Sequence, residues 1–185
     1  AVAAHQEAAI AAQEARIPCI RLDRKPLPLP VSPYLHPVQD DKEAAEVAAA
    51  IGGTVLLTTG SKHLSVYTQR LLQEEHVRLV VRLLPTVENM QLWAELGLDQ
   101  RDIVAIQGPF GDRLNQALYE HFSVRVLITK ESGAQRWIAE KVHRAMALGI
   151  HVVLIRRPPG VPGVPAFFDP VSLLRFVQAE LTTVI

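Results

Sequence analysis

Residues 55–62 have the sequence VLLTTGSK, an apolar strand pattern that runs straight into a polar, glycine-containing loop. Three further apolar runs lead in the same way into polar, cationic or glycine-containing loops: IVAIQGPFG (103–111), VLITKESG (126–133) and VVLIRRP (152–158). Helical patterns follow the first three runs, and this alternation predicts an α/β fold with a mainly parallel sheet covered on both faces. Because such sheets bind ligands beyond the carboxyl ends of their strands, we expect these loops to assemble one site.

The predicted elements fall into two parts, separated by a proline-rich connector. The chain opens with a helical pattern at 1–16 and a strand at 19–22, which implies an earlier strand in a βαβ fold. Five of the thirteen prolines lie in 25–37, a stretch that cannot form a helix or a central strand. We therefore predict two Rossmann-like domains: residues 1–24 as the end of the first, 25–37 as a linker and 38–185 as the second. The expected strands from residue 25 onward are 35–38, 54–58, 78–83, 103–106, 126–128 and 151–155, and the expected helices are 42–50, 64–73, 87–96, 112–122, 135–147 and 170–181.

Composition excludes several classes of function. The 185 residues carry no net charge, whereas a general nucleic-acid binder shows a basic excess. The most apolar segment, 77–84, is interrupted by Arg78 and Arg82, so no membrane span is expected. The single cysteine, Cys19, permits no internal disulfide and fits a cytoplasmic protein. None of the seven histidines pairs with another His or with Cys at metal-ligand spacing, so no metal site is expected.

Two of the loops have the chemistry of anion or cofactor sites. Residues 58–62 offer two threonine hydroxyls, a glycine and Lys62 just before a predicted helix, whose free N–H groups attract phosphate or carboxylate. A capped helix start with a surface lysine is the alternative, and the loop lacks the first glycine of an ATPase P-loop. In 107–111, Pro109 lies between two glycines that permit close backbone approach. Phe110 in this turn either contacts a flat ligand or fills the core, and Asn115 follows one turn into the next helix.

Cations end the other two strands. Lys130 is a candidate for holding a substrate carboxylate or for proton transfer, unless the adjacent Glu131 neutralises it. Ser132 and Gly133 add a hydroxyl and a backbone N–H near the following helix. The arginines at 156 and 157 match carboxylate and phosphate geometry, with a solvated charged loop as the alternative.

Taken together, these segments resemble the precorrin-6A reductase family of cobalamin biosynthesis. The matching pieces are LTTGSK (57–62), IQGPF (106–110) with Asn115, TKESG (129–133), GIHVVLIRRP (149–158) and IPCIRLDR (17–24). The resemblance implies two Rossmann-like domains, with NADPH and a tetrapyrrole in the cleft between them and hydride transfer to the macrocycle. The family's N-terminal glycine-rich turn does not occur in this sequence, and we expect that region to precede residue 1.

The resemblance and the loop chemistry together give a set of expected roles. Lys130 and Ser132 are expected to be catalytic. The residues expected to bind the cofactor are Thr59, Gly60, Ser61, Lys62, Gln107, Gly108, Pro109 and Phe110. Those expected to bind the substrate are Lys130, Glu131, Ser132, Gly133, Asn115, Arg156 and Arg157. Two other readings remain open: a tetrapyrrole enzyme without nicotinamide, similar to uroporphyrinogen-III synthase, and a non-catalytic small-molecule binding domain. The oligomeric state is left open.

Overall fold

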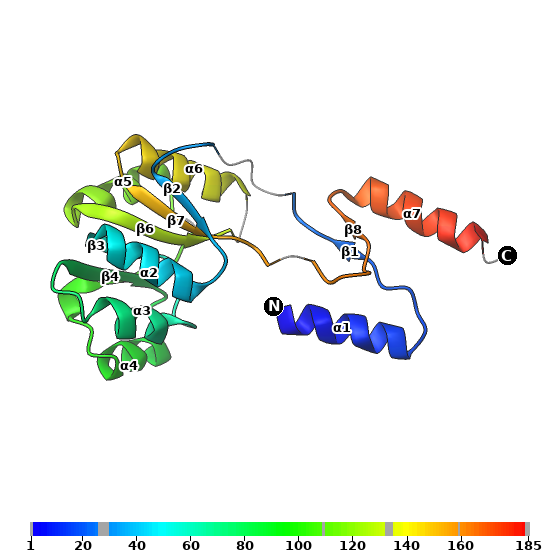
Figure 1. Cartoon of the computed structure of the whole chain (residues 1–185), viewed down its shortest axis with the longest axis horizontal. Coiled ribbons are helices and arrows are strands. Elements are labelled where there is room, and N and C mark those ends of the chain that lie inside the picture. The colour runs from blue at the N-terminus through cyan, green and yellow to red at the C-terminus, as the bar shows by residue number, and fades with distance from the viewer. Residues whose placement is uncertain (1, 26–29, 109, 132–134, 159, 184–185) are drawn as a thin grey trace. The chain divides into compact units, whose positions relative to one another are not determined.

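The computed structural model describes residues 2–25, 30–108, 110–131, 135–158 and 160–183. The chain forms two compact units (Figure 1). Residues 29–157 make up the larger unit, and residues 1–28 together with 158–185 make up the smaller one. Within the described residues, no helix is long and apolar enough to cross a membrane.

The larger unit is built on a six-stranded sheet in which every pairing is parallel, with the strand order β2-β7-β6-β3-β4-β5. Its strands are β2 (Leu35–Val38), β3 (Gly53–Leu57), β4 (Val77–Leu83), β5 (Ile103–Ala105), β6 (Val124–Lys130) and β7 (His151–Ile155). Its helices are α2 (Asp41–Ile51), α3 (Leu64–Leu71), α4 (Val87–Glu95), α5 (Asp112–His121) and α6 (Gln135–Ala147), with the short 3₁₀ helix η1 (Gln100–Asp102) before β5. The predicted α/β class with a mainly parallel sheet is confirmed.

The strand order fixes where a ligand site is expected. From β3 the chain proceeds outward through β4 to β5, then returns to place β6 on the other side of β3. The order therefore reverses between β3 and β6, and open parallel sheets bind ligands at the carboxyl ends of strands at such a switch point. The loops after these two strands begin at Thr58 and Glu131.

Alternation along the strands divides the sheet into two faces. Val55 and Leu57 of β3 belong to the main core, together with Ala44 and Ala48 of α2 and with Leu64 of α3. The intervening residues of the strands point to the opposite face, which α5 and α6 cover (Figure 1). Both faces are buried, which explains why the strands are nearly continuous apolar runs in the sequence.

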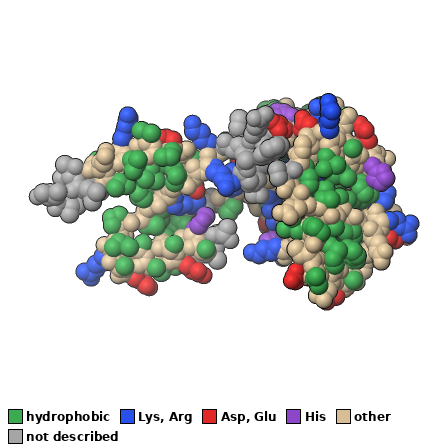
Figure 2. Space-filling model, turned by 180° about the vertical axis from the view of Figure 1, so that it is seen from behind, with side chains coloured by type: hydrophobic (Ala, Val, Ile, Leu, Met, Phe, Trp, Pro, Cys, Tyr) green, Lys and Arg blue, Asp and Glu red, His purple; other side chains and the backbone are tan. Residues whose placement is uncertain are grey.

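The smaller unit consists of α1 (Val2–Glu14), β1 (Arg21–Leu22), β8 (Ala166–Phe167) and α7 (Pro170–Thr183). The strands β1 and β8 are parallel, with Arg21 opposite Ala166 and Leu22 opposite Phe167. Figure 2, which views the molecule from behind, shows apolar side chains on the visible surface of both units. In the smaller unit the large exposed ones include Ile10, Ile17 and Leu174.

This division differs from the predicted domains in two places. The predicted linker 25–37 ends within the larger unit, because Leu35–Val38 forms β2 on the sheet edge, where Pro37 is tolerated. Residues 158–185, predicted as part of the second domain, instead group with residues 1–28 because β8 pairs with β1. The sequence indicates this second connection between the units, because four prolines lie in 158–165, a stretch even richer in proline than 25–37.

Candidate functional site

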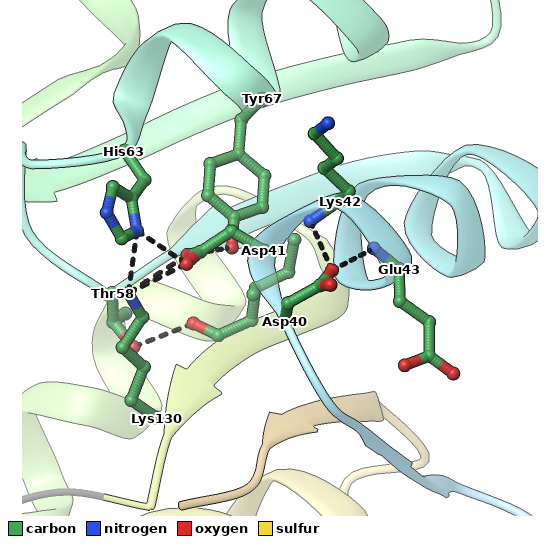
Figure 3. Close-up of polar contacts among 9 residues, drawn as sticks. Asp40, Asp41, Lys42, Glu43, Thr58, His63, Tyr67 and Lys130 are labelled. Carbon is green, nitrogen blue, oxygen red and sulfur yellow. Dashed lines mark hydrogen bonds and ion pairs between the residues drawn. The ribbon is translucent and has the colours of Figure 1, made fainter. Parts of the chain in front are cut away.

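Four side chains from three segments meet at the carboxyl edge, on the face covered by α2 and α3. His63, Tyr67 and Lys130 converge on the Asp41 carboxylate (Figure 3). The Tyr67 hydroxyl donates to Oδ1 at 2.7 Å, His63 Nδ1 lies 2.6 Å from Oδ2, and Lys130 Nζ donates to Oδ2 at 3.0 Å. Lys130 Nζ also lies 3.4 Å from His63 Nδ1. We call this set the Asp41 cluster.

Local helix chemistry positions the Asp41 cluster. Asp40 caps α2, since its carboxylate accepts hydrogen bonds from the backbone N–H groups of Lys42 and Glu43, both at 2.9 Å. This cap places Asp41 in the first turn of α2, at the positive end of the helix dipole. His63 immediately precedes α3, and Tyr67 follows one turn later on the same side.

The electrostatics keep Asp41 ionised. Burial raises the pKa of this carboxyl, but the hydrogen bonds from Tyr67, Lys130 and His63 outweigh burial and leave the pKa below its ordinary value. Burial, followed by the hydrogen bond to Asp41, raises the pKa of the Tyr67 hydroxyl far above its usual range. The cluster therefore contains a fixed anion that orients an ammonium and an imidazole, and such an arrangement suits proton transfer or the binding of an anionic group.

The partner of Lys130 differs from the one considered from the sequence. Successive strand residues point to opposite faces, so Lys130 and Glu131 cannot meet side by side. Glu131 is only 3% exposed and pairs with Arg156, whose Nε donates to Oε2 at 2.8 Å. The backbone N–H of Arg157 donates to the same oxygen at 3.3 Å, and Arg157 Nε donates to the Glu131 carbonyl at 2.7 Å. Glu131 thus joins the ends of β6 and β7.

A second polar group lies on the opposite face, beneath α5 and α6. Lys141 of α6 donates from Nζ to the hydroxyls of Thr58, at 3.2 Å, and of Thr129. Burial, and then the positive charge of Arg82, lower the pKa of Lys141 to about 7. Arg82 of β4 donates to Asn115 Oδ1 at 2.9 Å and lies 4.5 Å from the ring centroid of Phe110.

The two predicted cofactor loops follow β3 and β5. In the first, Thr59, Gly60 and Ser61 are half-buried and Lys62 is exposed. Gly60 has φ +81° with open space where a Cβ would stand, so the backbone conformation itself favours glycine there.

In the second loop, Gln107 and Gly108 are exposed, and a Cβ on Gly108 would lie 3.1 Å from the Phe110 ring. Phe110 folds back over Arg82 rather than standing free. Asn115 is 5% exposed and turned inward, where it also donates to the Gly111 carbonyl. Pro109, Ser132 and Gly133 lie outside the described residues, so their expected roles stay predictions.

Comparison with known proteins identifies the family. The family model described as precorrin-6x reductase CbiJ/CobK matches residues 1–178. This chain belongs to that family. The predicted resemblance is confirmed.

Three curated relatives illustrate the range of similarity. The cobalt-precorrin-6A reductase of Priestia megaterium is 45% identical over 148 residues, which cover 80% of this chain and 58% of the relative. The Salmonella typhimurium protein of the same name is 39% identical over 126 residues, 68% of this chain and 47% of the relative. The Rhodococcus erythropolis precorrin-6A reductase is 26% identical over 181 residues, 93% of this chain and 65% of the relative.

A solved structure shares the fold of this CbiJ/CobK family member. The structure named CobK precorrin-6A reductase superposes with a TM-score of 0.74 at 20% identity, covering 96% of this chain and 68% of that one. At this identity the match supports the fold alone. The chain spans about half the length of the first two curated relatives.

Sequence reasoning assigned no role to five polar residues of this edge: Asp41, His63, Tyr67, Arg82 and Lys141. Asp41 lies in the loop that follows the predicted strand 35–38, after Gln39 and Asp40, and this loop could have been recognised as a fifth strand-end loop. Arg82 interrupts the apolar run 77–84, and a charge inside a buried strand is itself a signal of a functional or paired side chain. Lys141 adjoins Val142 and precedes Ala145 by one turn, and both are buried. Its place on the apolar stripe of α6 marks it as an inward-facing cation. Among the described residues, no group of three or more His, Cys, Asp or Glu side chains forms a metal site.

Proposed function

We propose that this chain is part of an enzyme that reduces the precorrin-6A or cobalt-precorrin-6A macrocycle with NADPH. The observation that carries the proposal is the concentration of cations and donors at the carboxyl edge beside the β3–β6 switch point, in a member of the CbiJ/CobK family. Corrin precursors carry several acetate and propionate groups, and a neutral protein with a locally cationic edge attracts such a polyanion.

The residues of this edge fit the anionic parts of both molecules. Loop residues 59–62 precede α3, whose N-terminus favours phosphate, and Gly108 permits close approach of a flat group near Phe110. When bound, NADPH supplies a hydride to one carbon of a macrocycle double bond, and the neighbouring carbon takes a proton. We assign the loops 59–62 and 107–110 to cofactor contacts.

Lys130 is assigned to the reacting face. Its ammonium is partly exposed, with 27% of the side chain accessible, and Asp41 holds it in position. From that position it donates a hydrogen bond to a carboxylate of the substrate or helps to deliver the proton. Asn115 and Glu131 are turned inward, so we assign them to holding Arg82 and Arg156 rather than to direct substrate contact.

The test is a spectroscopic assay of the full-length protein with the precorrin-6A substrate and NADPH. The reaction is monitored through the loss of the dihydronicotinamide absorbance. We expect substrate-dependent oxidation in the wild type. Lys130→Ala is expected to reduce kcat/KM by about 100-fold, because one charged hydrogen bond to the reacting molecule is removed. Lys42→Ala, which removes an exposed lysine on α2, is the matched control and should retain wild-type turnover.

Two results would overturn the proposal at different levels. Absence of NADPH oxidation in the wild type, with both the metal-free and the cobalt-containing substrate, rejects the reductase function. Wild-type turnover in Lys130→Ala rejects the role of Lys130 while leaving the function intact.

A further inference from the structure

Two cations beneath α5 and α6, the buried Arg82 and the partly exposed Lys141, have no carboxylate partner among the described residues. Arg82 is 9% exposed, and its guanidinium bonds to the neutral amide of Asn115. The Lys141 ammonium bonds to two hydroxyls, those of Thr58 and Thr129. Among the described side chains, no carboxylate lies within ion-pair distance of either cation.

Such an arrangement is costly for the protein alone. A buried charge requires a counter-charge or a full set of hydrogen bonds, and neutral oxygens compensate only part of the lost hydration. The two cations also repel each other, since the charge of Arg82, after burial, contributes to the lowered pKa of Lys141. The other cations of this edge differ, because Lys130 pairs with Asp41 and Arg156 pairs with Glu131.

A third donor belongs to the same group. Tyr119 of α5 is 2% exposed, and its hydroxyl finds no hydrogen-bond partner within the part of the chain that the structure describes. Tyr119 lies one turn after Asn115 on the buried side of α5, and Asn115 is the residue that accepts the hydrogen bond from Arg82. The positive charge of Arg82 also opposes the rise that burial causes in the pKa of Tyr119. A buried hydroxyl without a partner is rare in native proteins and costs stability, so it calls for an explanation.

Strand alternation places the group beside the switch point. Leu57, Val81 and Ile128 belong to the main core, and Thr58, Arg82 and Thr129 are the next residues along the three strands. Because side chains alternate between the two faces of a sheet, these three residues lie on the face opposite the main core. Thr58 and Thr129 lie at the carboxyl ends of β3 and β6. Lys141 is partly exposed, and so is Phe110, whose ring centroid lies 4.5 Å from the Arg82 guanidinium, so the group lies directly beneath the strand-end surface.

We propose that Arg82, Lys141 and Tyr119 form an oxyanion-binding site that is completed by a carboxylate or phosphate group of a ligand. An oxyanion supplies the missing negative charge to both cations and accepts a hydrogen bond from the Tyr119 hydroxyl. The identity of its source rests on the proposed function: either a side-chain carboxylate of the tetrapyrrole or a phosphate of NADPH.

The first test is independent of that function. Thermal unfolding of the full-length protein is followed by tryptophan fluorescence in sodium phosphate and in sodium chloride of equal ionic strength. Phosphate at about ten times its Kd is expected to raise the wild-type Tm by about 3 °C or more. Lys141→Met should abolish this shift, and the exposed-lysine control Lys42→Met should keep it.

The variants also separate a binding role from a structural one. If Lys141 serves to bind an anion, Lys141→Met in chloride should melt at the wild-type temperature or higher, because a partly buried charge without a carboxylate partner has been removed. Tyr119→Phe should likewise keep or raise Tm in chloride and should reduce the phosphate shift. A Lys141→Met protein that melts several degrees lower in chloride, or that retains the full phosphate shift, overturns the proposal.

Titrations with NADPH and with uroporphyrin, a tetrapyrrole octacarboxylate, identify the source. A loss of affinity of about tenfold or more in Lys141→Met for one ligand supports the site and assigns it to that ligand. If the wild type shows no phosphate shift and Lys141→Met binds both ligands with wild-type affinity, the site does not exist. A Lys141-dependent phosphate shift in a protein that never oxidises NADPH rejects the reductase function and leaves the oxyanion site standing.

Discussion

Asp41→Asn is expected to destabilise the larger unit, and to do so only where the carboxylate is ionised. The aspartate accepts from Tyr67 at 2.7 Å, lies 2.6 Å from His63 Nδ1 and accepts from Lys130 at 3.0 Å. Asparagine keeps one acceptor oxygen but removes the charge and turns an amide N–H₂ toward these donors. About two charge-assisted hydrogen bonds are lost, each worth roughly 1.5–3 kcal/mol when buried.

Solvent exposure reduces the stabilisation that these hydrogen bonds provide. The His63 side chain is 41% exposed and Lys130 is 27% exposed, so solvent screens both interactions. We expect a net loss of about 2 kcal/mol at neutral pH, equivalent to about 4–8 °C in Tm for a chain of this size. Both tryptophans of this sequence, at 93 and 137, lie in residues 29–157, so fluorescence melts of the 185-residue chain report on the larger unit.

The pH dependence follows from the direction of the pKa shift. The pKa of Asp41 in the folded protein lies below its ordinary value of 3.8. Its stabilisation is therefore fully present above about pH 4 and is lost as the pH falls through the lower, folded-state pKa. The gap between wild type and Asp41→Asn should stay constant from pH 7 to pH 5 and narrow in more acidic solution.

The adjacent Asp40→Asn is a matched control. Asp40 caps α2, and asparagine caps helices about as well as aspartate, so this variant should remain within about 0.5 kcal/mol of the wild type. Equal melting temperatures for wild type and Asp41→Asn at neutral pH, or a gap that does not change on acidification, would refute the reasoning that a fixed carboxylate organises this cluster.

Three further predictions concern stability. First, the Tm of the wild type relative to that of Lys141→Met should rise between about pH 7 and pH 10. The pKa of Lys141 is about 7 in the folded protein and ordinarily 10.5, so the unfolded chain binds more protons over that range and the folded state gains stability as the pH rises. A difference in Tm that does not depend on pH would contradict this. Second, Gly52→Ala should cost more than Gly149→Ala in chemical unfolding. The two φ angles are +71° and +72°, giving about 1 kcal/mol of backbone strain in each, but only at Gly52 would a Cβ meet the His76 ring, at 2.5 Å. Similar losses would show that the ring moves aside freely. Third, Glu131→Gln should lower the free energy of unfolding by about 2 kcal/mol because a 3%-exposed carboxylate loses its pairing with Arg156. Glu46→Gln, at a 64%-exposed partner of Arg70, should change it by less than about 0.5 kcal/mol, and equal effects would argue against burial as the cause.

The order of helices and strands in the larger unit could be predicted because burial on both faces makes each strand a continuous apolar run. The two-residue strand β8 (Ala166–Phe167) of the smaller unit was not predicted. The strands 35–38 and 151–155 and the helix 135–147 have the predicted bounds, and most other elements differ by one or two residues. The largest miss in the sheet is β6, predicted as 126–128 and observed as Val124–Lys130. Thr129 and Lys130 are polar and were interpreted as loop, yet they continue the ladder opposite Leu154 and Ile155 of β7.

Pairing between distant side chains could not be predicted in the same way. Lys130 and Asp41 are 89 residues apart, and only the strand order brings β2 and β6 to the two sides of β7. From the sequence, the nearest acid to Lys130 is Glu131, which alternation sends to the other face. Periodicity therefore locates the edge of the sheet, whereas the partners along that edge depend on topology.

The position of the acids decides which cations at this edge are available to a ligand. The sequence alone gives no reason to prefer one cation of this edge over another as a ligand for a polycarboxylate. Lys130, Arg156 and Arg157 were therefore all expected to contact the substrate. In the fold, Asp41 already offsets Lys130 and Glu131 already offsets Arg156. The uncompensated charge instead lies on the opposite face, at Arg82 and Lys141, two residues that entered no sequence motif. An incoming oxyanion gains most where no carboxylate of the described residues pairs with the cations, so the strongest attraction is expected beneath α5 and α6 rather than at Lys130.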